Sequence, residues 1–185
     1  ELHRPLFSLI GSLVEPGKKT ARAYYGAGGW VAHVITNPWG FTSPGESAQW
    51  GSTSSGSAWL CTHLWEHWLF TRDRDYLARR AYQALKEASL FFVDYLVRDA
   101  KTGWLLTGPS HSPEQGPTTA GPTMDNQLIR FLWTATIAVA RELGTDAELA
   151  AQLGQLLPQL PPNQIGKHGQ LQEWQEDWDS EATDI

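Results

Sequence analysis

The sequence predicts an all-α protein built of helical hairpins, with long loops gathered at one end. Two observations predict this class. Apolar residues recur at helical spacing over residues 2–14, 54–71, 75–97, 124–143 and 146–157. The stretches between them are rich in glycine, proline or aromatic residues and show no sustained periodicity. Helical pairs of this kind stack side by side, and their functional groups collect on the connecting loops.

The N-terminal part predicts two short helices and a long loop. The helical pattern of residues 2–14 is interrupted by Glu15-Pro16-Gly17, so we expect that helix to end there. Residues 18–25 predict a second short helix, which the following glycines terminate. Residues 30–51 predict a long loop, and its aromatic content favours a functional loop over a disordered one.

The central and C-terminal parts predict two antiparallel helical hairpins. The break at residues 71–73 joins the helices of residues 54–71 and 75–97, and Gly144 joins those of residues 124–143 and 146–157. An aromatic run at residues 104–107 predicts a strand between the hairpins. Prolines after residue 157 end the second hairpin, and residues 166–174 predict a loop followed by a short helical start.

The loop at residues 108–117, Gly-Pro-Ser-His-Ser-Pro-Glu-Gln-Gly-Pro, is the stretch around which the two hairpins are arranged. Its three prolines and two glycines exclude a helix or a central strand and hold Glu114 in a series of turns. A carboxyl group on such a constrained loop suits a catalytic acid. The alternative is a solvated loop glutamate with no such role.

Composition narrows the classes of ligand. The formal charge is −6 and no cluster of lysine and arginine exceeds a pair, which argues against a nucleic acid or an anionic membrane as partner. No apolar run approaches the ~18 residues of a membrane-spanning helix. There are 10 tryptophans among 185 residues. Their flat faces suit the stacking of sugars, although tryptophans also fill helical cores.

One segment matches a zinc-peptidase pattern. Residues 63–67 read His-Leu-Trp-Glu-His, the H-x-x-E-H spacing in which two histidines bind the metal and the glutamate acts as base. A zinc site also needs a third protein ligand, and none stands nearby in the sequence. We therefore expect no metal here, and expect polar groups of this helix to bond a substrate or a neighbouring helix.

The loop at residues 33–40 places an imidazole, an amide and an indole close together. If this segment is extended, His33, Ile35 and Asn37 face the same way. They would then form one side of a sugar site. The alternative is that Asn37 simply shapes the turn before Pro38.

Five runs in this order resemble the catalytic domain of glycoside hydrolase family 95, the inverting α-L-fucosidases. The runs are residues 29–40 (Gly-Trp-Val-Ala-His through Asn-Pro-Trp-Gly), 56–67, 108–115 (with Ser-Pro-Glu), 123–127 (Thr-Met-Asp-Asn-Gln) and 166–174. The resemblance covers essentially the whole chain. It implies part of an (α/α)6 barrel, preceded by a β-sandwich domain and followed by a smaller β domain.

The resemblance also implies the chemistry. Glu114 would be the general acid, and Asn37 the water-orienting base, polarised by an aspartate from a later motif. His33 would contact the sugar. No cofactor is implied, the partner would be a fucosylated oligosaccharide or polysaccharide, and a periplasmic or secreted location is favoured. Further candidates for sugar contact, chosen as flat faces or hydroxyl partners, are Trp39, Trp59, His63, Trp65, Glu66, Asp125, Gln172, Glu173 and Trp174.

Two departures from the family pattern shape the expectations. Ile35 stands where members of the family often have asparagine, and the aspartate that would activate Asn37 lies beyond Ile185. We therefore expect a segment of a longer enzyme, inactive by itself. A related α-L-galactosidase of the same fold and a non-catalytic sugar-binding module remain as alternatives. In a hydrolase, Glu114 and Asn37 must face each other across one sugar-sized cavity.

Overall fold

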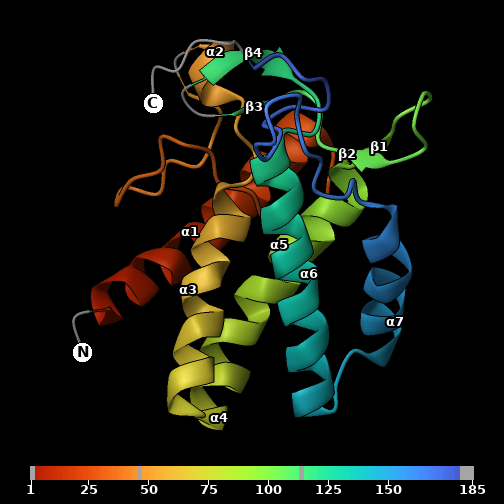
Figure 1. Ribbon diagram of the computed structural model, residues 1–185. Coiled ribbons are helices and arrows are strands. Elements are labelled where there is room, and N and C mark those ends of the chain that lie inside the picture. Colours follow the sequence, from red (N-terminus) through yellow and green to blue (C-terminus); the bar gives the residue numbers. More distant parts are fainter. Residues whose placement is uncertain (1–2, 46, 113–114, 180–185) are drawn as a thin grey trace.

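The protein forms a helical bundle with short strands and loops at one end (Figure 1). The structure, a computed structural model, describes residues 3–45, 47–112 and 115–179. Its elements in chain order are α1 (Arg4–Tyr25), α2 (Ala48–Gly51), α3 (Gly56–Thr71), α4 (Arg74–Tyr76), the π-helical turn η1 (Leu77–Ala81), α5 (Tyr82–Tyr95), β1 (Val97–Arg98), β2 (Leu105–Leu106), β3 (Ser110–Ser112), β4 (Gln115–Thr119), α6 (Thr123–Leu143), α7 (Ala147–Leu156) and the 3-10 turn η2 (Leu157–Gln159).

The two predicted helical hairpins are confirmed. α3 is followed by α4, η1 and α5, and α6 is followed by α7. The two ends of α6 carry the sequence signals from which its boundaries were predicted. Asp125 lies in its first turn, Arg141 lies in its last turn, and Gly144 ends the helix with φ 70°. α3, α5 and α6 pack against one another around a core that includes the fully buried Trp133.

The prediction that Pro16 ends the first helix is wrong. α1 continues through Pro16 as one helix to Tyr25. Gly17, the next residue, lies against Trp30, where a β-carbon would come within 2.8 Å of the indole ring. The Gly17 carbonyl also accepts a hydrogen bond from Val31 N at 3.3 Å. Packing of the following loop against the helix therefore outweighs the hydrogen bond that a proline cannot make.

The loop at residues 108–117 contributes to two short strands, and both are edge strands, in line with the expectation that its prolines and glycines exclude a helix or a central strand. β3 and β4 form a two-stranded antiparallel sheet, with Ser110 opposite Thr119 and Ser112 opposite Gln115. Pro117 is tolerated because a two-stranded sheet consists of edge strands only. The predicted strand at residues 104–107 is confirmed as β2, which pairs with β1.

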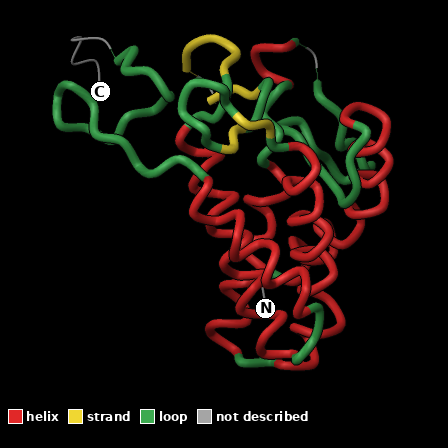
Figure 2. Tube along the Cα trace, turned by 90° about the vertical axis from the view of Figure 1, so that its right-hand side faces the viewer, coloured by secondary structure: helices red, strands yellow, loops and turns green. Residues whose placement is uncertain are grey.

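The tail differs from its prediction too. Residues 163–179 contain no helix, and a single bridge joins Ile165 to Leu171. Figure 2 shows that the helices fill one end of the molecule, while the strands and most loops lie at the other. Within the part of the chain that the structure describes, no helix is both long and apolar enough to cross a membrane.

Candidate functional site

The predicted acid, Glu114, lies outside the described residues. The described chain reaches Ser112 on one side and resumes at Gln115 on the other. The candidate site is therefore built from the residues that lead up to this position. They belong to β3, whose three residues are all buried.

Separate segments of the chain hold β3 and the residue before it. Tyr95, the last residue of α5, donates its hydroxyl to the Pro109 carbonyl at 2.6 Å. Thr53 donates its hydroxyl to the His111 carbonyl at 3.0 Å. The Ser112 hydroxyl donates to Glu173 Oε1 at 2.6 Å. The backbone leading to residue 114 is thus attached to α5, to the segment before α3 and to the tail.

Asp125 lies beneath the same strand. It is in the first turn of α6 and is 0% exposed. Its Oδ2 accepts the Thr107 hydroxyl at 2.7 Å. Burial raises the pKa of this carboxyl, while the hydroxyls of Ser110, Thr107 and Ser55 act in the opposite direction. The predicted sugar contact of Asp125 would have to be made by a side chain that is closed off from solvent.

The predicted tail residues meet the hairpin. Trp174 is buried, and it packs on Gly116, where a β-carbon would lie 2.6 Å from the indole ring. Gly116 also has φ 66°, which glycine adopts without strain. Glu173 is half-buried and bonded to Ser112. Gln172 is buried, and its amide donates to the carbonyls of Trp174 and Gln175 at 2.7 and 3.0 Å. It therefore shapes the tail.

His33 is buried at the base of the first long loop, 1% exposed. Its Nδ1 lies 2.7 Å from the Thr42 carbonyl, so Nδ1 carries the proton. Its Nε2 then accepts the Tyr25 hydroxyl at 2.5 Å. Burial lowers the pKa of His33 to about 4, against the smaller opposing effect of the Thr42 hydrogen bond. Both ring nitrogens are thus occupied by protein partners.

Asn37 and Trp39 lie farther out on the same loop. Asn37 Oδ1 accepts two backbone N–H groups, from Trp39 at 3.0 Å and Phe41 at 3.3 Å. This is the turn-shaping role considered as the alternative for Asn37. Trp39 is 90% exposed. The loop turns after His33 instead of remaining extended, so His33 is buried while Asn37 stays half-exposed.

A stack of aromatic rings connects the two loops. The Tyr25 ring stacks on His33 at a centroid distance of 5.7 Å and meets Tyr95 edge-on at 4.9 Å. Tyr95 in turn donates to Pro109. The base of the Asn37 loop and the start of β3 are therefore linked through two tyrosines.

The predicted residues of α3 divide into two groups. Trp59 lies in the first turn of α3, at the loop end, and is 53% exposed. His63, Trp65 and Glu66 lie about one to two turns farther along the helix. Trp65 lines a cavity of about 860 Å³ with Trp104 and Phe131. His63 and Glu66 line another of about 310 Å³. The structure does not bring these three residues to β3.

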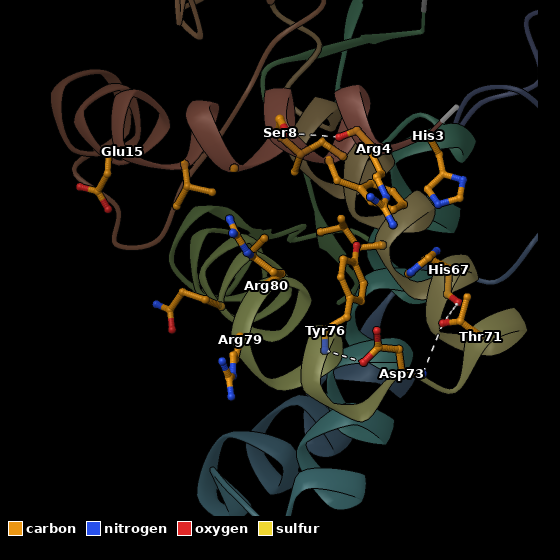
Figure 3. A pocket seen from close by; sticks show the side chains of 17 residues that line it. His3, Arg4, Ser8, Glu15, His67, Thr71, Asp73, Tyr76, Arg79 and Arg80 are labelled. Carbon is orange, nitrogen blue, oxygen red and sulfur yellow. Dashed lines mark hydrogen bonds between the residues drawn. The ribbon is translucent and has the colours of Figure 1, made fainter. Parts of the chain in front are cut away.

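The histidines of the zinc-peptidase pattern take part in aromatic packing. His67 lies 4.8 Å from His3, 5.1 Å from Phe7 and 4.5 Å from Tyr76, measured between ring centroids. Figure 3 shows His3, His67 and Tyr76 around a cavity of about 850 Å³ between α1 and the α4–η1 segment. Among residues 3–45, 47–112 and 115–179, no group of three histidine, cysteine or acidic side chains is placed to hold a metal.

Sequence reasoning missed the residues that hold β3 from behind. Tyr95 and Thr53 carry no motif, and their partners lie 14 and 58 residues away along the chain. Tyr25 sits only 8 residues before His33, but nothing in their spacing indicates a stacked pair. The one signal in the sequence was Ser112, whose hydroxyl, two residues before the predicted acid, is able to bond a neighbouring segment.

Comparison with known proteins gives concordant results. The model of the glycosyl hydrolase family 95 catalytic domain matches residues 1–184. "Alpha-L-fucosidase 2" of Arabidopsis thaliana is 36% identical over 190 residues, which cover 97% of this chain and 22% of that protein. "Probable alpha-fucosidase A" of Aspergillus niger is 34% identical over 189 residues, which cover 97% of this chain and 24% of that protein. The chain thus spans less than a quarter of the length of these relatives.

A solved structure described as "Putative kojibiose phosphorylase from human microbiome" superimposes with a TM-score of 0.69 over 84% of this chain and 22% of that one. At 10% identity the likeness concerns the fold alone. The family match runs from the first residue to the last but one and includes every segment that meets at β3. The chain belongs to the glycosyl hydrolase family 95 catalytic domain family.

Proposed function

We propose that the longer polypeptide containing this chain hydrolyses terminal α-L-fucosides with inversion at the anomeric carbon. The match to the family 95 catalytic domain and the names of two relatives, both α-fucosidases, support the substrate class. The substrate would be a fucosylated oligosaccharide or polysaccharide. The single observation that carries the proposal is the anchoring of the segment that presents Glu114, by hydrogen bonds from different parts of the fold.

Glu114 is the general acid in this proposal. A general acid must stay within hydrogen-bond reach of the glycosidic oxygen through the reaction. Tyr95 and Thr53 donate to the Pro109 and His111 carbonyls, and Glu173 accepts the Ser112 hydroxyl; this anchoring of the preceding residues supports the role. Among the candidates for sugar contact, Glu173 bonds Ser112 and Trp174 packs on Gly116, two described residues that flank this position in the sequence.

Asn37 is the proposed water-orienting group. A neutral amide is a weak base, so it needs a carboxylate partner from a later part of the polypeptide. In the present geometry its Oδ1 accepts from Trp39 N and Phe41 N. Of these, the 3.3 Å bond from Phe41 is the longer. Water held by Asn37 would replace that bond, and the turn at residues 39–41 would open slightly.

The fold proposal extends beyond this chain. Helical hairpins with functional loops at one end suit a part of an (α/α)6 toroid, and the likeness to a larger helical enzyme supports that architecture. The remaining barrel helices, a preceding β-sandwich and a following β domain would belong to the longer polypeptide.

The experiment follows fucose release from a fucosylated oligosaccharide by the longer polypeptide, with the first-formed anomer read by NMR. β-L-Fucose is the expected first product, since inversion converts the α linkage to the β anomer. Glu114→Gln should lower kcat by about 10²- to 10⁴-fold. Glu148→Gln, an exposed glutamate of α7, is the matched control and should not change kcat.

Two outcomes would overturn the proposal. If the α anomer forms first, the reaction retains configuration. If the corresponding α-L-galactoside is turned over faster than the fucoside, the enzyme is a galactosidase of the same fold. Binding of fucosylated oligosaccharide without turnover would instead indicate a sugar-binding module.

A further inference from the structure

We infer that Asp125 is a positioning residue that holds the acid loop, here residues 107–112 leading to Glu114, from within the protein through its hydrogen bond with Thr107. The inference rests on the proposed role of Glu114. It differs from the prediction that Asp125 contacts the sugar, because the side chain is 0% exposed. Its effect on the reaction would therefore pass through the backbone of residues 107–110.

Asp125 lies where three segments converge. Thr107 follows β2, Ser110 opens β3, and Ser55 lies immediately before α3; the hydroxyls of all three act on the pKa of this one carboxyl group. Of these hydroxyls, that of Thr107 donates directly to Asp125 Oδ2 at 2.7 Å. The backbone of Thr107 is held as well, because its carbonyl accepts a hydrogen bond from Gly121 N at 2.8 Å. The carboxyl group is thus bonded to Thr107, whose backbone in turn joins the two ends of the β3–β4 sheet.

The polar character of this cluster is unusual for a helical core. Ser55 Oγ, Ser110 Oγ and Asp125 Oδ1 are buried, and none of them has a hydrogen-bond partner among the described residues. Apolar residues would avoid the desolvation cost of such atoms. The bond between Asp125 Oδ2 and the Thr107 hydroxyl is the one formed here, so the carboxyl group holds this segment through Thr107.

The substitution Asp125→Asn tests whether this side chain holds residues 107–112. It keeps the shape of the side chain but replaces one acceptor oxygen by an NH2 donor. The Thr107 hydroxyl can rotate to meet it, so the core can still pack, while the acceptor that Oδ2 offers to Thr107 is lost. Displacement of a catalytic group by about 1 Å is enough to lower a rate by about 10²-fold.

The matched control is Asp146, an aspartate at the opposite end of α6. It also accepts two side-chain bonds, from Tyr82 and Lys86, each at 2.7 Å. It lies in the turn between α6 and α7, away from the loops of the candidate site. Asp146→Asn therefore reports the loss of a structural carboxylate with no effect on the acid loop.

The test compares Asp125→Asn and Asp146→Asn in the longer polypeptide, by fucoside kinetics, Tm and hydrogen–deuterium exchange of peptides spanning residues 105–120. Asp125→Asn should lower kcat by about 10- to 100-fold with KM unchanged within about twofold. Exchange at residues 105–120 should become faster in this variant alone. Asp146→Asn should lower Tm with kcat unchanged. If Asp125→Asn does not fold, Thr107→Val removes only the 2.7 Å bond and should act in the same direction.

Two results overturn the inference while leaving the proposed function intact. An unchanged kcat in Asp125→Asn with a lowered Tm would make the residue purely structural. A raised KM with unchanged kcat would make it a sugar contact. If the wild-type polypeptide releases no fucose, the proposed function fails instead, and the exchange measurement still decides whether Asp125 holds the hairpin.

Discussion

The two loops at the functional end of the bundle are held in opposite ways. Beyond its buried base at His33, the Asn37 loop is shaped by its own turn, and Trp39 at its tip is 90% exposed. The segment before Glu114 pairs with β4, and it is also held by Tyr95, Thr53 and Glu173 from more distant parts of the chain.

This difference suits the two roles proposed for the loops. A proton donor must keep one position, so it gains from anchors on several segments of the scaffold. A group that holds a water must exchange partners, so a locally closed turn at the surface is adequate. Remote substitutions should therefore disturb the acid loop, whereas only nearby ones should disturb the Asn37 loop.

The largest expected effect concerns the base of the Asn37 loop. Trp30 is fully buried and donates its indole N–H to the Ala84 carbonyl at 2.9 Å. Trp30→Ala should lower the free energy of unfolding by about 3–5 kcal/mol, measured by urea unfolding. Trp39→Ala, in the same loop but exposed, should change it by less than about 0.5 kcal/mol. Equal losses of unfolding free energy in the two variants would mean that Trp39 at the tip of the loop packs against the core as Trp30 does.

His33 makes the base of this loop sensitive to acid. Burial holds its pKa at about 4 in the folded protein. The unfolded chain binds this proton near pH 6.5, so from that pH down to about 4 the unfolded state binds more protons and stability falls. Below pH 4 both states are protonated and the loss stops. The total loss should be roughly 3 kcal/mol.

The measurement is urea unfolding at pH 7 and at pH 4.5 for the wild type, His33→Gln and His168→Gln. His33→Gln should lose less stability between the two pH values than the wild type does. His168→Gln, at an exposed position, should behave as the wild type. Parallel losses in all three proteins would show that His33 titrates normally.

The smallest expected effect probes the acid loop alone. Tyr95→Phe keeps the ring contacts with Tyr25 and Phe91 but leaves the Pro109 carbonyl without its 2.6 Å donor. Stability should fall by about 1–2 kcal/mol, since a buried acceptor loses its partner. Hydrogen exchange should rise at residues 107–112 and stay unchanged at residues 33–42. Tyr24→Phe, at an exposed tyrosine, should alter neither. A response shared by both loops would contradict the contrast drawn between them.

Local sequence signals determined most of the helical architecture. The apolar spacing of residues 124–143, the acidic residue of the first turn and Gly144 at the end were sufficient for α6, because each acts within a few residues of itself. The two hairpins followed from such signals. The motifs around Ser-Pro-Glu and Asn-Pro-Trp-Gly also pointed to the family that the comparison confirms.

Only the tertiary structure decided the features that depend on distant contacts. α1 passes through Pro16 because Trp30 and Val31 pack against Gly17, and β3 is buried because Tyr95, Thr53 and Glu173 reach it from other segments. Whether Asp125 faces solvent or Thr107 depended on how α6 meets β2, which no spacing along the chain encodes. Periodicity reports the preferences of neighbouring residues, whereas the burial of a side chain is set by whichever remote segment packs over it.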